Sequence, residues 1–89
     1  VTATISNLTI TGGNQGAFPG GGGILNYGTL TLNGSTVTQN TAAYYSGGIE
    51  SFFGGTLTLN GSTVTNNTAA AGGGGIGSNG PLTLNNFRN

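Results

Sequence analysis

Residues 29–42 read TLTLNGSTVTQNTA, and residues 56–69 read TLTLNGSTVTNNTA. Thirteen of these fourteen positions are identical when position 29 is aligned with position 56. The same alignment places residues 2–5 on residues 29–32, and a further copy begins at Pro81, slightly earlier than this period would place it. A nearly fixed period of this length is typical of proteins built from stacked supersecondary units.

A second motif recurs between these copies. Gly-Gly-Ile occupies residues 22–24, 47–49 and 74–76. The chain is rich in glycine, with 20 among 89 residues, and such a composition often indicates a flexible linker. A flexible linker does not require two motifs to recur at a nearly constant spacing, so the pattern favours an ordered repeat over disorder.

Each repeat contains three short segments with strand character, represented by residues 24–26, 29–32 and 36–38. Period-two alternation places Leu30, Leu32 and Val37 on one face of these strands and the intervening threonines on the other. Turn-forming residues such as Asn33-Gly34 and Asn40 separate the segments. No apolar stripe of helical period is present. The pattern predicts an all-β fold, a β-solenoid of about three coils, each of roughly 25–27 residues with three short strands.

The strings GGGILNYGTLTLNGSTVTQNTA (residues 21–42) and SGGIESFFGGTLTLNGSTVTNNTA (residues 46–69) resemble the right-handed parallel β-helix repeats of large bacterial surface and secreted proteins, including autotransporter passenger domains. The resemblance covers nearly the whole chain. It implies a right-handed parallel β-helix at an extracellular or cell-surface location, in a group that includes adhesins, stalks and fibres. The right hand also agrees with the general preference of parallel crossovers. We expect a single β-solenoid domain over residues 1–89, with repeats at about 2–28, 29–55, 56–80 and a partial repeat at 81–89.

Stacking of the aligned copies predicts ladders of equivalent residues, about 4.8 Å apart along the stack. The predicted core ladders are Ile24, Ile49 and Ile76; Ala3, Leu30, Leu57 and Leu82; Ile5, Leu32, Leu59 and Leu84; and Ile10, Val37 and Val64. Asparagine ladders are predicted at Asn33, Asn60 and Asn85 and at Asn40 and Asn67, where stacked amides can hydrogen-bond along the axis.

The scarcity of ionisable residues excludes most catalytic chemistry. The chain has one acidic and one basic residue, Glu50 and Arg88, and contains no histidine, cysteine, aspartate or lysine. Zinc, iron–sulfur and thiolate sites therefore lack their usual ligands, and neither a nucleophile–histidine pair nor a pair of carboxylates can form. We expect no enzyme activity, no cofactor, no metal site and no nucleic-acid partner, because one arginine cannot neutralise several phosphates. No apolar stretch is long enough to predict a membrane span. Glu50 and Arg88 are expected at the surface or in contacts between subunits.

Three surface features have both a structural and a functional interpretation. Threonine pairs that flank an inward residue recur at 9/11, 36/38 and 63/65 and at 29/31 and 56/58. They resemble the flat ice-binding arrays of some antifreeze solenoids, although threonine is also a common strand residue on a solvated face. Candidates for stacking or lateral contacts are aromatic: Tyr44, Tyr45, Phe52 and Phe53. They can cover a corner of their own coil, contact a neighbouring protein or stack on a sugar.

Four Asn-x-Ser/Thr sequons are candidate glycosylation sites in a secreted chain, at Asn7, Asn33, Asn60 and Asn66. In a chain this rich in asparagine and threonine, most of them are also expected by chance.

These features lead to competing functional hypotheses. The first is a non-enzymatic structural subunit that stacks head to tail on copies of itself into an extracellular filament, because uncapped strand edges with almost no charge are templates for further pairing. The alternatives are a fragment of a surface adhesin or passenger domain, and an ice-binding protein that uses the outward Thr-x-Thr arrays. Carbohydrate binding is a further hypothesis.

Overall fold

The computed structural model describes residues 2–16, 20–52, 54–70 and 74–85. All regular secondary structure in these ranges is β-strand, in thirteen short elements that form four parallel sheets. We number the sheets 1 to 4 in the order in which the chain visits them. Sheet 1 contains β1 (Thr2–Ser6), β5 (Thr29–Asn33), β9 (Thr56–Asn60) and β13 (Leu82–Asn85). Sheet 2 contains β2 (Thr9–Thr11), β6 (Thr36–Thr38) and β10 (Thr63–Thr65). Sheet 3 contains β3 (Asn14–Gln15), β7 (Thr41–Ala42) and β11 (Thr68–Ala69), and sheet 4 contains β4 (Ile24–Asn26), β8 (Ile49–Ser51) and β12 (Ile76–Ser78).

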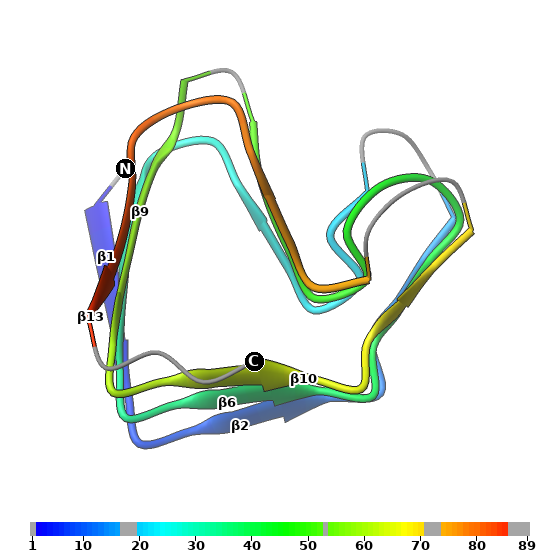
Figure 1. The fold of residues 1–89 in the computed structure, drawn as a ribbon, viewed down its shortest axis with the longest axis horizontal. Helices are drawn as coiled ribbons and strands as arrows, with labels where there is room; N and C mark the ends of the chain where they lie inside the picture. Colours follow the sequence, from blue (N-terminus) through cyan, green and yellow to red (C-terminus); the bar gives the residue numbers. More distant parts are fainter. Residues whose placement is uncertain (1, 17–19, 53, 71–73, 86–89) are drawn as a thin grey trace.

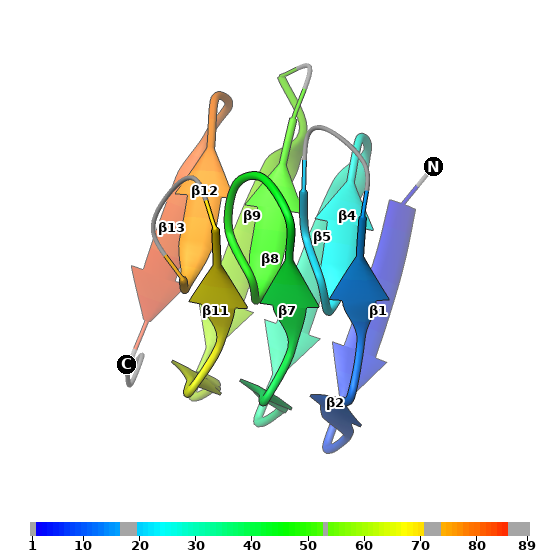
Figure 2. The same ribbon diagram turned by 90° about the vertical axis from the view of Figure 1, so that its right-hand side faces the viewer.

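Each repeat visits the four sheets once before the next repeat lies beside it. Viewed along the stack, the backbones of successive repeats nearly superimpose (Figure 1), and in the perpendicular view the repeats appear side by side (Figure 2). Thr29 pairs with Thr2 on one side and Thr56 on the other, which is the alignment of the sequence repeats. In β13 the register follows the earlier start of the last copy, since Leu82 pairs with Leu57. The all-strand, parallel repeat expected from the sequence is confirmed, and the arrangement is consistent with a β-solenoid.

The strand count differs from the expected three per repeat. A fourth strand, represented by β7 and β11, follows the second corner in each repeat. Each of these strands has only two residues, and their ladder pairs Thr41 with Thr68 and Ala42 with Ala69. A two-residue strand is too short to show an alternating pattern, so the sequence signal is absent although the backbone pairs.

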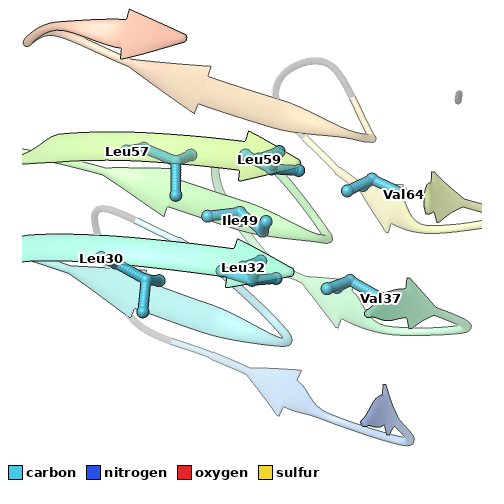
Figure 3. Packing of buried hydrophobic residues seen from close by; sticks show 7 residues of the cluster. All are labelled: Leu30, Leu32, Val37, Ile49, Leu57, Leu59 and Val64. Carbon is cyan, nitrogen blue, oxygen red and sulfur yellow. The ribbon is translucent and has the colours of Figure 1, made fainter. Parts of the chain in front are cut away.

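The apolar core lies between sheets 1, 2 and 4 of adjacent repeats, as Figure 3 shows. Its buried members are Leu30, Leu32, Val37, Ile49, Leu57, Leu59 and Val64, and Ile5, Ile10, Ile24 and Ile76 pack against it while partly exposed. The remaining members of the predicted ladders on β13, Leu82 and Leu84, keep the expected register but lie exposed. No further repeat of the described chain covers their strand, and this explains the difference.

Polar side chains at the corners hydrogen-bond from one repeat to the next. Asn40 is buried; its Oδ1 accepts from Gly13 N at 2.8 Å, and its Nδ2 donates to Ile10 O at 3.1 Å. Asn40 Nδ2 also donates to Asn67 Oδ1 at 3.0 Å. On sheet 1, Asn60 Nδ2 donates to Asn33 Oδ1 at 2.9 Å, and Asn85 Nδ2 donates to Asn60 Oδ1 at 2.9 Å. Both predicted asparagine ladders are thus confirmed.

The Gly-Gly-Ile motif reflects close approach of backbones between repeats. A Cβ at Gly47 would collide with the backbone of Thr68, and one at Gly48 would lie 2.8 Å from Gly75 O and 2.9 Å from Val64 Cγ1. Real Cβ atoms do not approach this closely, so only glycine allows the chain to turn tightly into β8. The motif therefore positions Ile49 in the core and Glu50 on the opposite face of the strand.

Candidate functional site

Among the described residues, each of the four sheets ends in a strand that is paired on one side only. These edge strands are β1, β2, β3 and β4 at one end of the stack and β10, β11, β12 and β13 at the other. Figure 2 shows the two ends as opposite faces of the molecule. An edge strand presents unpaired N–H and C=O groups that can pair with a further strand. The two end faces are therefore the first candidate interaction sites.

At the β13 end, the edge also exposes apolar side chains. Leu82 and Leu84 are 41% and 44% exposed, whereas their ladder partners Leu57 and Leu59 are fully buried at 0%. The inward side of β13 therefore offers two leucines that another strand would cover, while Thr83 points to the opposite face.

At the other end, the residues that begin the same ladders are also accessible. Ala3 is exposed and Ile5 is half-buried, although both pair in register with Leu30 and Leu32 of β5. A pocket of about 380 Å³ lies beside the corner between β4 and β5 and is lined in part by Ala3, Leu25 and Tyr27. Both end faces thus combine unpaired backbone with apolar surface.

Sheet 2 forms a regular outward array of threonines. Its register pairs Thr36 with Thr9 and Thr63, and Thr38 with Thr11 and Thr65. All six positions are exposed or half-buried, and the inward residues between them are Ile10, Val37 and Val64. The array presents two columns of hydroxyl and methyl groups without a charge.

The aromatic candidates separate into two places. Phe52 lies at the corner after β8 and is half-buried, with its ring centroid 6.4 Å from that of Tyr27 in the preceding repeat, at an interplanar angle of 44°. Tyr44 and Tyr45 lie in the loop between β7 and β8, and both are exposed. Phe53 lies outside the described residues. The structure therefore places Phe52 beside the equivalent corner of the preceding repeat and leaves the loop tyrosines accessible.

The four sequons have different environments. Asn33 and Asn60 are half-buried, and their amides form the sheet 1 ladder. Asn7 and Asn66 are exposed at corners with φ of 58° and 55°. Of the four asparagines, Asn7 and Asn66 are therefore the more accessible to a modifying enzyme.

Glu50 is not at the surface, contrary to the expectation from its charge. It lies on β8 with 6% of its surface exposed, and its Oε1 is buried without a hydrogen-bond partner. It pairs in register with Leu25 and Gly77. Nothing in its local sequence marks it as buried; the reason is its place in the middle repeat. Arg88 lies outside the described residues.

The described part of the chain has no cluster of three or more acidic, histidine or cysteine side chains suited to a metal ion. The same part of the chain contains no helix long and apolar enough to cross a membrane. Comparison with protein-family models, curated proteins and solved structures finds no match to this chain.

Proposed function

We propose that the protein is a non-enzymatic structural subunit, a right-handed parallel β-helix that stacks head to tail on copies of itself to form an extracellular filament. One observation carries this proposal: Leu82 and Leu84 keep the register of the core ladders but remain exposed at an edge strand. Fully burying an exposed leucine contributes about 1.5–3 kcal/mol, so covering each of these two, which are already more than half buried, contributes about half of that, and each paired backbone group adds a hydrogen bond. A second copy of the same repeat supplies the matching register.

The strand count of the described residues sets the geometry of the contact. Sheet 1 has four strands, whereas sheets 2, 3 and 4 have three. A subunit rise of three strand spacings keeps these three sheets unbroken, with β10 against β2, β11 against β3 and β12 against β4 of the next copy. At this rise, β13 of one copy and β1 of the next compete for one place in sheet 1. β13 retains it, because Leu82 and Leu84 bury more apolar surface than Ala3 and Ile5, and β5 of the next copy then covers both leucines.

The test is electron microscopy of the purified protein, with a power spectrum of any fibre. The proposal predicts fibres with a strand spacing of about 4.8 Å and a subunit rise of about 14 Å, which is three strand spacings. A rise of about 19 Å, or four spacings, would mean that β13 of one copy pairs directly with β1 of the next. Fibre growth should depend on protein concentration. Discrete particles at all concentrations would contradict the filament and favour the alternative, a segment of a surface adhesin or passenger domain.

A pair of substitutions on β13 locates the contact. Leu84→Lys places a charge where the next copy would stack, and Thr83→Lys places the same charge on the outward face of the same strand. Both side chains are exposed in a single subunit, so both variants should fold. We expect Leu84→Lys to abolish fibres and Thr83→Lys to retain them. Fibres from Leu84→Lys would show that the β13 end is not the interface.

The threonine array of sheet 2 favours a second candidate function, ice binding. Six outward threonines in two columns, spaced by the parallel strands, form a regular surface without charge. Thermal hysteresis of the wild-type protein tests this candidate. Thr36→Tyr should lower the hysteresis, whereas Thr41→Tyr, at an exposed position of sheet 3 outside the Thr-x-Thr arrays, should leave it unchanged. A wild-type protein without hysteresis would eliminate ice binding.

A further inference from the structure

The single carboxylate side chain of the described residues is buried, and one of its oxygens has no hydrogen-bond partner among them. Glu50 is 6% exposed, and its Oε1 makes no hydrogen bond. The chain has no lysine or histidine, and its one arginine lies at position 88, outside the described ranges. Removing an ionised carboxylate from water costs several kcal/mol unless a positive charge or hydrogen bonds compensate. The described residues offer no positive side chain for this purpose.

Two glycines in the flanking repeats make room for the Glu50 side chain. An added Cβ at Gly21, in the first repeat, would lie 3.2 Å from Glu50 Cβ. A Cβ at Gly77, in the third repeat, would collide with both Glu50 Oε1 and Ser46 Oγ. The carboxylate therefore extends toward the third repeat, where its unpaired oxygen and the Ser46 hydroxyl both lie beside Gly77.

Ser46 occupies an unusual backbone position for a residue with a side chain. Its φ is 56°, in the left-handed region, and the equivalent residue of the preceding repeat is Gly21, with φ of 80°. Side chains in this region cost about 1–2 kcal/mol, and glycine avoids that cost. Ser46 is also buried. The serine therefore places an oxygen beside Glu50 at a position where glycine would be less strained.

We propose that Glu50 Oε1 and Ser46 Oγ together bind one hard, oxygen-liganded cation, Ca²⁺, between the second and third repeats. A cation supplies the positive charge that the described residues lack, and hard cations prefer carboxylate, hydroxyl and carbonyl oxygens. Ca²⁺ accepts irregular coordination, whereas Mg²⁺ requires near-octahedral geometry and loses its water reluctantly. One carboxylate is a small ligand charge, so the affinity should fall in the weak range of extracellular calcium modules, with Kd of about 1 mM. This site is independent of fibre formation.

The test is thermal unfolding at constant ionic strength, with choline chloride replaced by CaCl₂ or MgCl₂. At about 10 mM Ca²⁺, the Tm of the wild-type protein should rise by about 6–11 °C, and the same concentration of Mg²⁺ should change it by less than about 1 °C. Glu50→Gln keeps the shape of the side chain and removes its charge, so its Tm should not respond to Ca²⁺. The control variant Thr38→Val, on the outward face of sheet 2, should respond as the wild type does.

Equilibrium dialysis with radioactive Ca²⁺ provides a second readout, because it measures binding directly rather than through the Tm. We expect one Ca²⁺ per chain for the wild-type protein and a weakened affinity for Ser46→Gly, which keeps the backbone turn and removes the hydroxyl. A wild-type protein whose Tm does not change with Ca²⁺ and which binds no Ca²⁺ in dialysis would overturn the proposal. An equal Ca²⁺ shift in Glu50→Gln would overturn it as well, because the cation would then bind elsewhere.

Discussion

Strands β9 and β13 share the sequence Leu-Thr-Leu-Asn, lie next to each other in sheet 1 and pair in register. Leu57 and Leu59 on β9 are 0% exposed, whereas Leu82 and Leu84 on β13 are 41% and 44% exposed. Neither residue type nor strand alternation differs between them. The difference arises because β9 has a strand on both sides and β13 has one on one side only. Burial in this protein therefore depends on the neighbouring repeats, and equivalent residues contribute differently to stability in different repeats.

The largest expected effect is the loss of a leucine from the middle of the stack. Leu59→Ala should lower the free energy of unfolding by about 2–5 kcal/mol, because the core around it is closed and the removed atoms leave a cavity. Leu84→Ala, at the equivalent position of β13, should cost less than about 1 kcal/mol in the single subunit. Urea unfolding at concentrations where the protein is monomeric measures both. Equal losses would mean that burial by neighbouring repeats does not account for stability.

A buried corner amide should show the second-largest effect. Asn40→Ala removes the acceptor of Gly13 N and the donor to Ile10 O at a buried position, and unpaired buried groups cost about 1–3 kcal/mol. Asn67, the equivalent residue in the third repeat, is half-buried, so water can replace part of what Asn67→Ala removes. We expect Asn40→Ala to lower the free energy of unfolding by about 2–3 kcal/mol, and Asn67→Ala to lower it by about 1 kcal/mol less. Chemical denaturation of both variants tests this order, and a larger loss for Asn67→Ala would reverse the comparison.

The outer amide ladder of sheet 1 should show the same contrast at a smaller scale. Asn60 both donates to Asn33 Oδ1 and accepts from Asn85 Nδ2, whereas Asn85, at the exposed end of the ladder, makes one of these bonds. Asn60→Ala should lower the free energy of unfolding by about 1 kcal/mol, and Asn85→Ala should lower it by about half of that. Differential scanning calorimetry of the two variants provides the comparison. Identical Tm values would show that bonds along this ladder do not contribute to stability.

The sequence predicted those features that depend on spacing alone. The alternation of Thr29-Leu30-Thr31-Leu32 indicated which side chains point inward, and the nearly identical repeats indicated the register and the asparagine ladders. These properties are local or periodic, so a single chain suffices to show them. The short strand β7 was missed because two residues carry no alternating pattern.

The environments of the candidate site residues depend on contacts between stacked repeats, which the sequence does not show. Leu84 has nearly the same neighbours in sequence as Leu59, so its exposure follows only from the absence of a covering strand among the described residues. Glu50 was expected at the surface or in contacts between subunits, because it and Arg88 are single charges far apart in the sequence. Its burial depends on Gly21 and Gly77, which lie a full repeat or more away in the chain and become its neighbours only when the repeats stack.

The smallest expected effect separates backbone strain from stacking. The second corner of each repeat has a positive φ: Gly12 at 75°, Gln39 at 56° and Asn66 at 55°. Gln39 is exposed and its backbone is held between repeats, since its N–H donates to Asn66 O at 3.1 Å and its carbonyl accepts from Gly12 N at 3.2 Å. Glycine adopts this conformation without a steric penalty, and part of the gain is offset by the greater freedom of the unfolded chain. Gln39→Gly should therefore stabilise the protein by about 0.5 kcal/mol, or raise its Tm by about 2–4 °C.

The matched control for this corner is Thr38→Gly, one position earlier in strand β6, where φ is not positive. Glycine at this position loses more conformational entropy on folding than threonine does and relieves no strain, so the Tm should fall by several degrees. Opposite signs at two adjacent residues would show that the middle repeat, although it is the best-packed part of the stack, contains a strained corner that its neighbours hold in place. If Gln39→Gly lowers the Tm as Thr38→Gly does, the corner is not strained. The stability of the middle repeat would then arise from burial and hydrogen bonds alone, as the comparison of β9 with β13 indicates.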